Sequence, residues 1–416
     1  MPPAADVQRD DATPEALAQN RDFRVLLVSQ GISSLGDAVS FTALPLLVLA
    51  LTGSGVAMGV VGALQTLPDL VFGMVAGALA DRNDRKRMMF GADLGRAVLT
   101  ALIPLAVLLH GPTMAVVLLV AAPLSMLRSL FLAGYTASVP ALVGRPQLAR
   151  ANAIFETIYS AGYIVGPSIA GALATVIGPG PTLGIDAVSF ALSSLGLFLV
   201  RRPLRAPIDR PQTRIVDDIR EGIQFILGHP ILRSAILLWG ISSIVTAPIV
   251  AALAFRITRD LGLSPTILGL VLTAYGVGTV AGSLAATRIG RRTSVAPVLL
   301  LGQFATGVML VGISFAGDVP AVIGFALGAG IAQSLVLVTY ITVRTAYSPD
   351  HLLGRVGSTA RVVSLGLQPL GMLGGGVLID ATSGTTTIAV MGAALCVLAL
   401  AFVPVRALRR ANLAGR

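Results

Sequence analysis

The residues of this sequence best suited to chemistry are ionisable side chains inside long apolar stretches. Asp37, Asp69 and Arg128 each lie well inside such a stretch, and Glu156 lies near the start of another. A charge inside a membrane is costly, so each of these residues is a candidate for function. Burial favours the protonated form of a carboxyl group and a nearby arginine favours the ionised form, so a carboxyl group beside an arginine could bind and release a proton near neutral pH. The other interpretation of Asp37 is a structural hydrogen bond.

The elements that must position these residues are membrane-spanning helices. The sequence has 416 residues, of which 55% are hydrophobic and only 12% charged, and its mean hydropathy is +0.84. Soluble domains carry about a quarter charged residues. Twelve apolar stretches are each long enough to cross a membrane as a helix, which predicts an all-α membrane protein with twelve transmembrane helices. The predicted spans are 24–50, 56–80, 88–110, 113–138, 150–176, 182–200, 233–255, 264–286, 296–316, 320–345, 356–380 and 385–405.

Basic residues fall mainly in alternate connections between the apolar stretches. The net charge is +10, and the run at 81–87 and the connection 201–232 hold many of the basic residues. Under the positive-inside rule these connections and both termini lie in the cytoplasm, which predicts a multi-pass protein of the plasma (inner) membrane. Residues 1–22 and 406–416 are then cytoplasmic tails. We favour this role of the positive charge over nucleic-acid binding.

The chain also contains two similar halves, at 23–200 and 233–405. The segment GALADRNDRKR at 77–87 has a weaker echo in GSLAATRIGRR at 282–292, and AGYIVGPSIAGAL at 161–173 has one in LGLQPLGMLGGGV at 365–377. Both echoes are about half a chain length apart, as a duplicated six-helix unit predicts. The connection 201–232 is expected to contain an amphipathic helix at the cytoplasmic surface. Its apolar positions are Ile215, Ile219, Ile223 and Ile226.

Several kinds of site are disfavoured by the residues present. Lys86 is the only lysine and follows Arg85, so the phosphate-binding motif of an ATP-driven pump is absent from the sequence. The three histidines lie far apart and Cys396 is the only cysteine, so we expect neither a metal nor a cofactor. The sequence shows no convergent Asp/His or Ser/His set for a membrane-embedded enzyme. Its cytoplasmic segments are too short for the output domain of a receptor.

At the segment 77–87 the sequence resembles the major facilitator superfamily, and the resemblance extends over essentially the whole chain. Asp84 stands where the motif G-x-L-x-D-R-x-G-R-K/R usually has glycine. The resemblance implies a monomer of two six-helix halves that works by alternating access. It also implies that the aspartate of the motif clamps neighbouring helix ends while the cytoplasmic side is closed, since a carboxylate can bridge positive helix ends and guanidinium groups. The matching residues of this expected latch are Gly77, Asp81, Arg82, Arg85 and Lys86.

Two interpretations of the charges near this latch stay open. Asp81 could instead be a solvated surface charge. Asp93 and Arg96, three positions apart in the stretch 88–110, could belong to the latch or serve structure alone.

A second superfamily motif, G-x-x-x-G-P-x-x-G-G, has a match in the stretch 150–176, where Ala170 replaces one glycine. In the superfamily this element is typical of exporters that exchange substrate for protons. Small residues also let helix backbones approach closely and proline bends a helix, so generic packing is the alternative. The matching residues are Gly162, Gly166, Pro167 and Gly171.

The stretch RDFRVLLVSQGISSLGDAVSFTALPLLV is similar to the branch that holds the enterobactin exporter and macrolide-efflux proteins. Leu124 and Arg128 also resemble the antiport motif L-x-x-x-R, although the Gln-Gly that follows it is missing. The resemblance implies that the first and fourth helices line the cavity, so Asp37 with Arg128 could form the proton site. We therefore expect a proton-coupled exporter of amphipathic small molecules such as a drug, a macrolide or a siderophore. A proton-coupled importer of a small nutrient is the alternative, and the motif at 162–171 argues against it. Candidates for contact with the substrate are Trp239, Tyr275, Gln303, Gln333, Tyr340 and Gln368.

Overall fold

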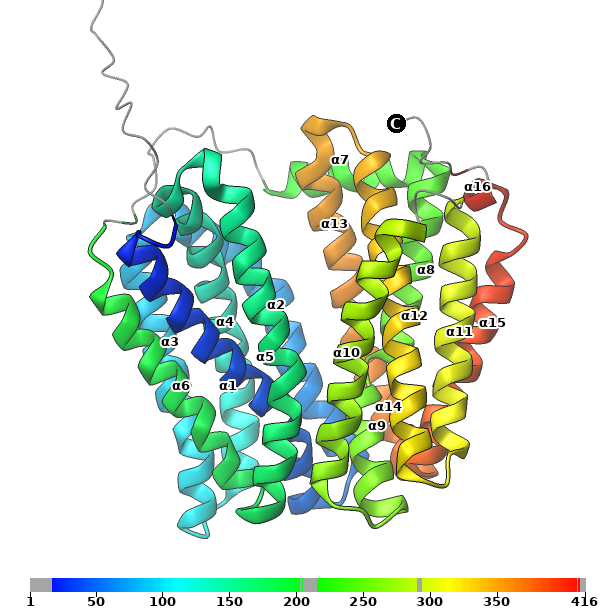
Figure 1. The fold of residues 1–416 in the computed structure, drawn as a ribbon, viewed down its shortest axis with the longest axis horizontal. Helices are drawn as coiled ribbons and strands as arrows, with labels where there is room; N and C mark the ends of the chain where they lie inside the picture. The colour runs from blue at the N-terminus through cyan, green and yellow to red at the C-terminus, as the bar shows by residue number, and fades with distance from the viewer. Residues whose placement is uncertain (1–16, 203, 205–214, 290–293, 410, 412–416) are drawn as a thin grey trace, which may run out of the picture.

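The structure is a computed structural model that describes residues 17–202, 204, 215–289, 294–409 and 411. The described residues form helices joined by short turns (Figure 1). The first half contains α1 (Arg21–Thr52), α2 (Gly55–Arg82), α3 (Arg85–Leu108), α4 (Thr113–Val143), η1 (Arg145–Gln147), α5 (Leu148–Val176) and α6 (Pro179–Leu199). The second half contains α8 (Pro230–Thr246), α9 (Ile249–Phe255), the π-helical turn η2 (Arg256–Asp260), α10 (Pro265–Ile289), α11 (Val295–Phe315), α12 (Val319–Ala346), η3 (Asp350–Leu352), α13 (Leu353–Gly366), α14 (Gln368–Ala381), α15 (Gly384–Phe402) and α16 (Arg406–Arg409).

Every apolar stretch predicted from the sequence forms one helix or a run of consecutive helices. Eleven segments of the described chain are long and apolar enough to cross a membrane. α5, with 29 residues, is not among them, because polar residues such as Asn152, Glu156 and Ser160 are spread along it. It packs against α1 of its own half and α10 of the other half, so protein replaces much of the lipid around it. The predicted all-helical, membrane-spanning architecture is confirmed.

Two spans of the second half are broken near their middle. The α8 helix ends at Thr246 and α9 begins after Pro248, while α13 ends at Gly366 and α14 contains Pro369 in its first turn. Proline has no backbone N–H to donate and its ring clashes with the preceding turn, so a continuous helix is disfavoured at both places. The two broken spans contact each other near these breaks, since Gly371 lies against the carbonyl group of Ile244 and Gly375 against Pro248. Protein contacts of this kind make irregular backbone tolerable within a membrane.

The two halves stand side by side, and the start of α1 and the helix α16 lie at the same end of the molecule (Figure 1). We call this end the terminal face. The other end, which holds the turns at Gly53, Gly111, Gly178 and Gly317, is called the opposite face. Gly53 adopts a φ of 65° where α1 ends, a left-handed conformation that glycine tolerates without strain, so the chain can turn directly into α2.

The halves contact each other mainly through two helix pairs, α5 with α10 and α2 with α14. If the second half repeats the first, α2 corresponds to α10 and α5 to the α13–α14 span. The two contacts are then the same contact made twice, as a pseudo-two-fold axis between the halves requires.

Glycines let these helix pairs approach closely near the opposite face. A Cβ atom on Gly171 would lie 2.5 Å from the carbonyl oxygen of Pro265, and one on Gly376 would lie 2.4 Å from the carbonyl oxygen of Gly55. Towards the terminal face, a Cβ atom on Gly73 or Gly77 of α2 would have no described heavy atom within 4 Å. The halves are therefore packed together at the opposite face, and α2 leaves the interface as it approaches the terminal face.

At the opposite face, a carboxylate of the second half binds the start of a helix of the first half. Asp380, near the end of α14, accepts hydrogen bonds from the Ser54 hydroxyl (2.6 Å) and from the backbone N–H groups of Gly55 and Val56 at the start of α2. The N-terminal end of a helix carries unpaired N–H groups and a partial positive charge, so it is a natural site for a carboxylate. This contact joins the two halves, and we call it the Asp380 clamp.

The connection between the halves forms the predicted helix, α7 (Ile215–Gly228), at the terminal face. Ile226 is buried, whereas Ile223 is 42% exposed, and the side chains of Ile215 and Ile219 lie outside the described residues. Glu221 forms an ion pair with Arg355, and Gly222 lies against Thr359. The helix is therefore fixed to α13 of the second half.

We predict that replacement of Asp380 by asparagine favours opening of the opposite face. Loss of a capping carboxylate costs about 1 kcal/mol, which corresponds to a roughly five-fold shift between two conformations. The measurement is the electron–electron distance between spin labels at Leu109→Cys and Phe315→Cys, two exposed positions on different halves, in a Cys396→Ala background. The distance distribution should shift to longer values.

Asp318→Asn is the matched control, because Asp318 caps α12 of its own half through the N–H of Ala321 and bridges nothing between the halves. Equal distance distributions for the Asp380 and Asp318 variants would contradict a role of the Asp380 clamp in closure.

Candidate functional site

Charged residues from different helices meet inside the first half. The guanidinium of Arg96 on α3 lies 2.5 Å from a carboxylate oxygen of Asp37 on α1 and 3.3 Å from one of Asp93, a turn earlier on α3. The Asp37 side chain is 24% exposed, whereas those of Arg96 and Asp93 are 4% and 0% exposed. One arginine therefore holds two carboxylates, of which only Asp37 can meet solvent.

A third carboxylate completes this group. Asp186 on α6 is 3% exposed and accepts hydrogen bonds from the hydroxyls of Ser40 at 2.5 Å and Ser189 at 3.1 Å. Gly36 of α1 makes room for it, because a Cβ atom there would lie 2.5 Å from an Asp186 oxygen and 2.0 Å from the Ser189 hydroxyl. We call Asp37, Asp93, Arg96 and Asp186 the charge cluster.

The ring of Phe190 packs against the guanidinium of Arg96 and helps to fix its position. The guanidinium carbon of Arg96 lies 3.7 Å from the centre of this ring, and Phe190 is almost fully buried. A guanidinium is attracted to the face of an aromatic ring, and the attraction grows when water is excluded. Phe190 stands one turn after Asp186 on α6. Its contact with Arg96 therefore brings the guanidinium close to the helix that carries Asp186.

The structure gives several candidate residues surroundings that differ from those expected. Asp37 pairs with Arg96 rather than with the expected Arg128, whose side chain on α4 is exposed. Glu156 is exposed on α5, and the side chain of Asp69 lies outside the described residues. Asp186 was not among the expected site residues, although it is also an acid inside a predicted span and the same criterion would have found it.

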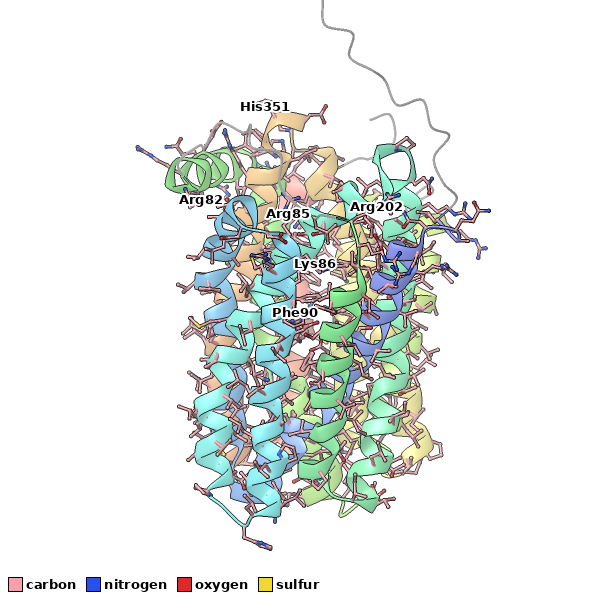
Figure 2. The ribbon with its side chains drawn as sticks, turned by 90° about the vertical axis from the view of Figure 1, so that its left-hand side faces the viewer. Arg82, Arg85, Lys86, Phe90, Arg202 and His351 are labelled. Atoms are coloured by element: carbon pink, nitrogen blue, oxygen red, sulfur yellow. The ribbon has the colours of Figure 1, made fainter. Side chains whose placement is uncertain are left out.

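Asp93 and Arg96 belong to the charge cluster in the interior of the first half, not to the turn between α2 and α3. The side chain of Asp81 in the expected latch is not described, and Arg82 is exposed. Arg85 is buried and donates to the carbonyl oxygens of Ala80 and Ala137, while Lys86 donates to that of Phe198 at 3.0 Å. These residues surround the turn at the terminal face (Figure 2).

The two basic side chains therefore bind carbonyl groups in the last turns of α2 and α6 and one carbonyl group of α4, all within their own half. Cations stabilise the negative ends of helices, which explains this arrangement. Asp84, the residue that departs from the superfamily motif, caps α3 by accepting a hydrogen bond from the N–H of Arg87 at 3.2 Å. In this position an N-cap aspartate replaces the usual glycine and stabilises the first turn of α3.

The glycine motif of α5 divides its contacts between the two halves. A Cβ atom on Gly166 would lie 2.5 Å from that of Ala38, so this part of α5 packs tightly on α1, and Gly162 likewise lies against Ser34. Gly171 instead meets α10 of the other half, and a Cβ atom on Gly269 would lie 2.3 Å from the carbonyl oxygen of Pro167. The motif thus sits where α5 passes from its own half to the interface.

The expected substrate-contact residues are not gathered in one place. Trp239 and Tyr340 stack with their ring centres 5.1 Å apart, and Tyr340 is buried. Gln303 is fully buried in the second half, whereas Tyr275 is exposed. Gln333 and Gln368 are half-buried. In this conformation Tyr275 is therefore the most accessible of the set.

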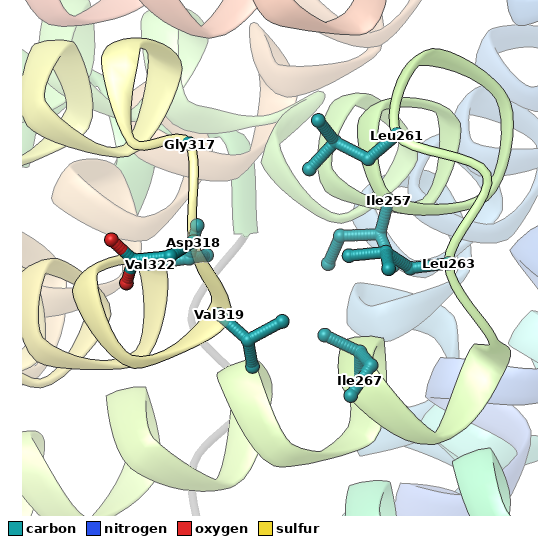
Figure 3. Close-up of a pocket in the computed structure, with 8 residues that line it drawn as sticks. All are labelled: Ile257, Leu261, Leu263, Ile267, Gly317, Asp318, Val319 and Val322. Carbon is teal, nitrogen blue, oxygen red and sulfur yellow. The ribbon is translucent and has the colours of Figure 1, made fainter.

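A separate small pocket lies at the opposite face of the second half, between η2, the start of α10 and the start of α12 (Figure 3). Its walls are apolar, with Ile257, Ile267 and Val319 among them, and Asp318 is its one ionisable lining residue. It is built from other helices than the charge cluster, and its acid is already engaged as the cap of α12.

Comparison with known proteins identifies the class of molecule that contains this cluster. Residues 12–414 match the transmembrane secretion effector family. The chain is 28% identical over 400 residues to the multidrug efflux pump Tap of Mycolicibacterium fortuitum, covering 94% of this chain and 97% of that one. It is 30% identical over 408 residues to Tap of Mycobacterium tuberculosis, covering 94% of each chain. It is 27% identical over 361 residues to the enterobactin exporter EntS of Escherichia coli, covering 85% of each.

Solved structures show the same fold. The nucleoside transporter NupG aligns with a TM-score of 0.74 at 13% identity, covering 93% of this chain and 99% of that chain. A bacterial homologue of the human lysosomal transporter Spinster, in an inward-facing and unoccupied conformation, aligns with a TM-score of 0.74 at 16% identity, covering 95% and 98%. The expected major facilitator fold is confirmed. The chain belongs to the transmembrane secretion effector family, and it is a membrane transporter rather than an enzyme.

We predict that Arg96→Met destabilises the protein far more than Arg128→Met. Removal of Arg96 leaves buried carboxylates without their cation, and breaking a buried ion pair in this way costs about 3 to 5 kcal/mol. Arg128 is the matched control because it is also a membrane arginine of the first half but is exposed. The measurement is the thermal unfolding midpoint of each purified variant.

A second substitution, Asp37→Asn, should restore part of the stability of the Arg96→Met variant, because it removes one unpaired charge. If the two single arginine variants unfold at the same temperature, Arg96 does not hold the charge cluster together.

Proposed function

We propose that this member of the transmembrane secretion effector family is a proton-coupled exporter of amphipathic small molecules, such as a drug, a macrolide or a siderophore. The observation that carries the proposal is the charge cluster, in which Asp37 and Asp93 pair with Arg96, Asp186 lies within its electrostatic reach, and only Asp37 is partly exposed. Buried acids with one accessible member suit a site that loads and releases a proton. The relatives named as a multidrug efflux pump and as an enterobactin exporter favour export of small molecules.

The direction of transport follows from the orientation that we propose. The basic residues around the α2–α3 turn and in the connection 201–232 support an orientation in a plasma (inner) membrane with the terminal face and both termini in the cytoplasm. The halves are packed together at the opposite face, so the conformation in the structure is the one that receives substrate from the cytoplasm. Rocking of the halves about the α5–α10 and α2–α14 contacts would then carry the substrate outward.

In the outward-open conformation the terminal ends of α2 and α13 must close. Gly73 and Gly77 of α2 and Gly354 and Gly357 of α13 have open space at their Cβ positions, which permits close approach of the two backbones. We assign Asp81 and Arg82 the role of a latch in that conformation. Arg85 and Lys86 hold the α2–α3 turn in shape within its own half.

The proposed exporter works as a monomer, and its substrate would lie between the halves near the membrane midplane. Asp37 and Arg128 of the first half would face it, with Glu156 nearer the cytoplasm. Tyr275 of α10 is the accessible candidate contact on the other side. An aromatic side chain opposite charged groups suits amphipathic molecules, which combine apolar area with a few polar groups.

We expect an imposed pH gradient to drive uphill efflux of a macrolide or an ethidium-type dye from proteoliposomes that contain the wild-type protein. Asp37→Asn should abolish the dependence on the gradient, because the amide cannot take up a proton. Asp318→Asn, which changes an acid at the opposite face, is the control and should behave like wild type. The measurement is the initial rate of efflux with and without the gradient.

If the efflux rates of wild type and Asp37→Asn depend equally on the pH gradient, Asp37 is not the proton-binding site. No response of the wild-type protein over a broad panel of compounds would contradict proton-coupled export and would favour uptake of a small nutrient.

We also expect that a cross-link between α5 and α10 stops transport. The hydroxyls of Thr175 and Thr266 lie 2.9 Å apart on different halves near the opposite face. Cysteines at both positions in a Cys396→Ala background should form a disulfide under mild oxidation, lock this face shut and remove efflux, and a reducing agent should restore it. Efflux that continues at the same rate in the oxidised double variant, with the single cysteine variants as controls, would contradict alternating access by separation of α5 from α10.

A further inference from the structure

The charge cluster contains more acid than base. Asp37, Asp93 and Asp186 contribute three carboxyl groups, and Arg96 contributes the one guanidinium seated among them. Arg128 on α4 would add a second positive charge and would still leave an acid in excess. An ionised carboxylate kept inside a membrane without a cation costs several kcal/mol, whereas the neutral acid does not. Protonation of one carboxyl group would remove this cost in the conformation shown.

Asp186 has the surroundings that suit the protonated group. Its two partners are the hydroxyls of Ser40 and Ser189, which can accept a hydrogen bond as readily as donate one, so they fit both the neutral and the ionised acid. Asp37 and Asp93 are instead both in contact with Arg96, which favours their ionised forms. Asp186 is also closely packed, since Gly36 leaves no space for a Cβ atom between it and α1.

The helices packed against α6 show which other groups act on Asp186. The charged groups that act on Asp186 are Asp37 from α1 and Arg96 from α3. The α5 helix packs more lightly on α6, and its ionisable residues are Arg150, Glu156, Tyr159 and Tyr163. Arg96 rests on Phe190, one turn after Asp186 on α6, and it acts electrostatically on Asp186 as well as pairing with Asp37.

From this geometry we infer that Asp186 is a buried proton-binding site that competes with Asp37 for Arg96. The inference rests on the proposed function and names the residue that stores the proton in it. In the conformation shown, Arg96 pairs with ionised Asp37 while Asp186 keeps its proton.

In the transfer step the O–H bond of Asp186 breaks and an O–H bond forms on Asp37. Arg96 then leaves Asp37 and pairs with the new Asp186 carboxylate. The total charge of the cluster is unchanged, so the step avoids an extra buried charge. Asp37, which reaches solvent, then releases the proton.

The first test is difference infrared spectroscopy of the purified full-length protein, which detects the C=O stretch of a protonated carboxylic acid. We expect this band in wild type, its loss in Asp186→Asn and its persistence in Asp93→Asn. Asparagine keeps the shape of the side chain and can hydrogen-bond to Ser40, so the fold should survive. A band that persists in Asp186→Asn, or that disappears only in Asp93→Asn, overturns the inference.

The second test is efflux of a macrolide from proteoliposomes. Asp186→Asn should bind and pass the macrolide down its own gradient but should lose efflux driven by a pH gradient. Gradient-driven efflux at the wild-type rate in Asp186→Asn overturns the inference. If Asp186→Asn does not fold, Ser40→Ala takes its place, because it keeps the acid but removes a hydrogen-bond partner. It should shift the pH dependence of the infrared band, and an unshifted band overturns the inference.

The two tests separate this inference from the proposed function. If wild-type efflux ignores the pH gradient, proton-coupled export fails, while the infrared band still decides whether Asp186 holds a proton.

Discussion

A single guanidinium held inside the membrane is the constraint on which the first half depends. Arg96 can be kept there only because Asp37 and Asp93 balance its charge and the ring of Phe190 covers its face. These partners come from α1, α3 and α6, so the relative rotation of three helices is fixed by one side chain. The tight packing at Gly36 and the hydrogen bond from Ser40 then bring Asp186 into the same group. The residues of the charge cluster therefore also hold the helices of the first half in fixed positions.

The contact between the halves has the opposite character. Among the described side chains it uses glycine backbones and hydroxyl pairs, such as Thr175 with Thr266 and Ser168 with Thr273. Such contacts are individually weak and leave little to desolvate when the helices part. The Asp380 clamp lies at the exposed edge, where water can replace it. Strong interactions within each half and weak ones between halves are what a rocking motion of two rigid bodies requires.

Much of this architecture was predictable from the sequence, and the site was predictable only in part. The spans were found because apolar stretches must match the membrane thickness, and Asp37, Asp93 and Arg96 stood out as charges within them. Depth along a helix can be read from a sequence, but rotation about its axis cannot, so Asp37 was assigned to Arg128 although the structure pairs it with Arg96. Asp186 lies inside the predicted span 182–200, where the same criterion applied to it would have marked it, whereas Asp380 is the last residue of the span 356–380, where an acid carries no such signal. Their roles depend on Gly36 and Ser54, which are distant in sequence.

The lower apolar content of α5 has a consequence for biogenesis. A nascent helix is released from the translocation machinery into lipid according to its own hydrophobicity. The other spans are apolar enough by length and composition, whereas α5 is less apolar. Its extensive packing on α1 therefore offers it more support in the bilayer than its light packing on α6. For the fifth helix, tertiary contacts have more to add to membrane insertion than for the other spans.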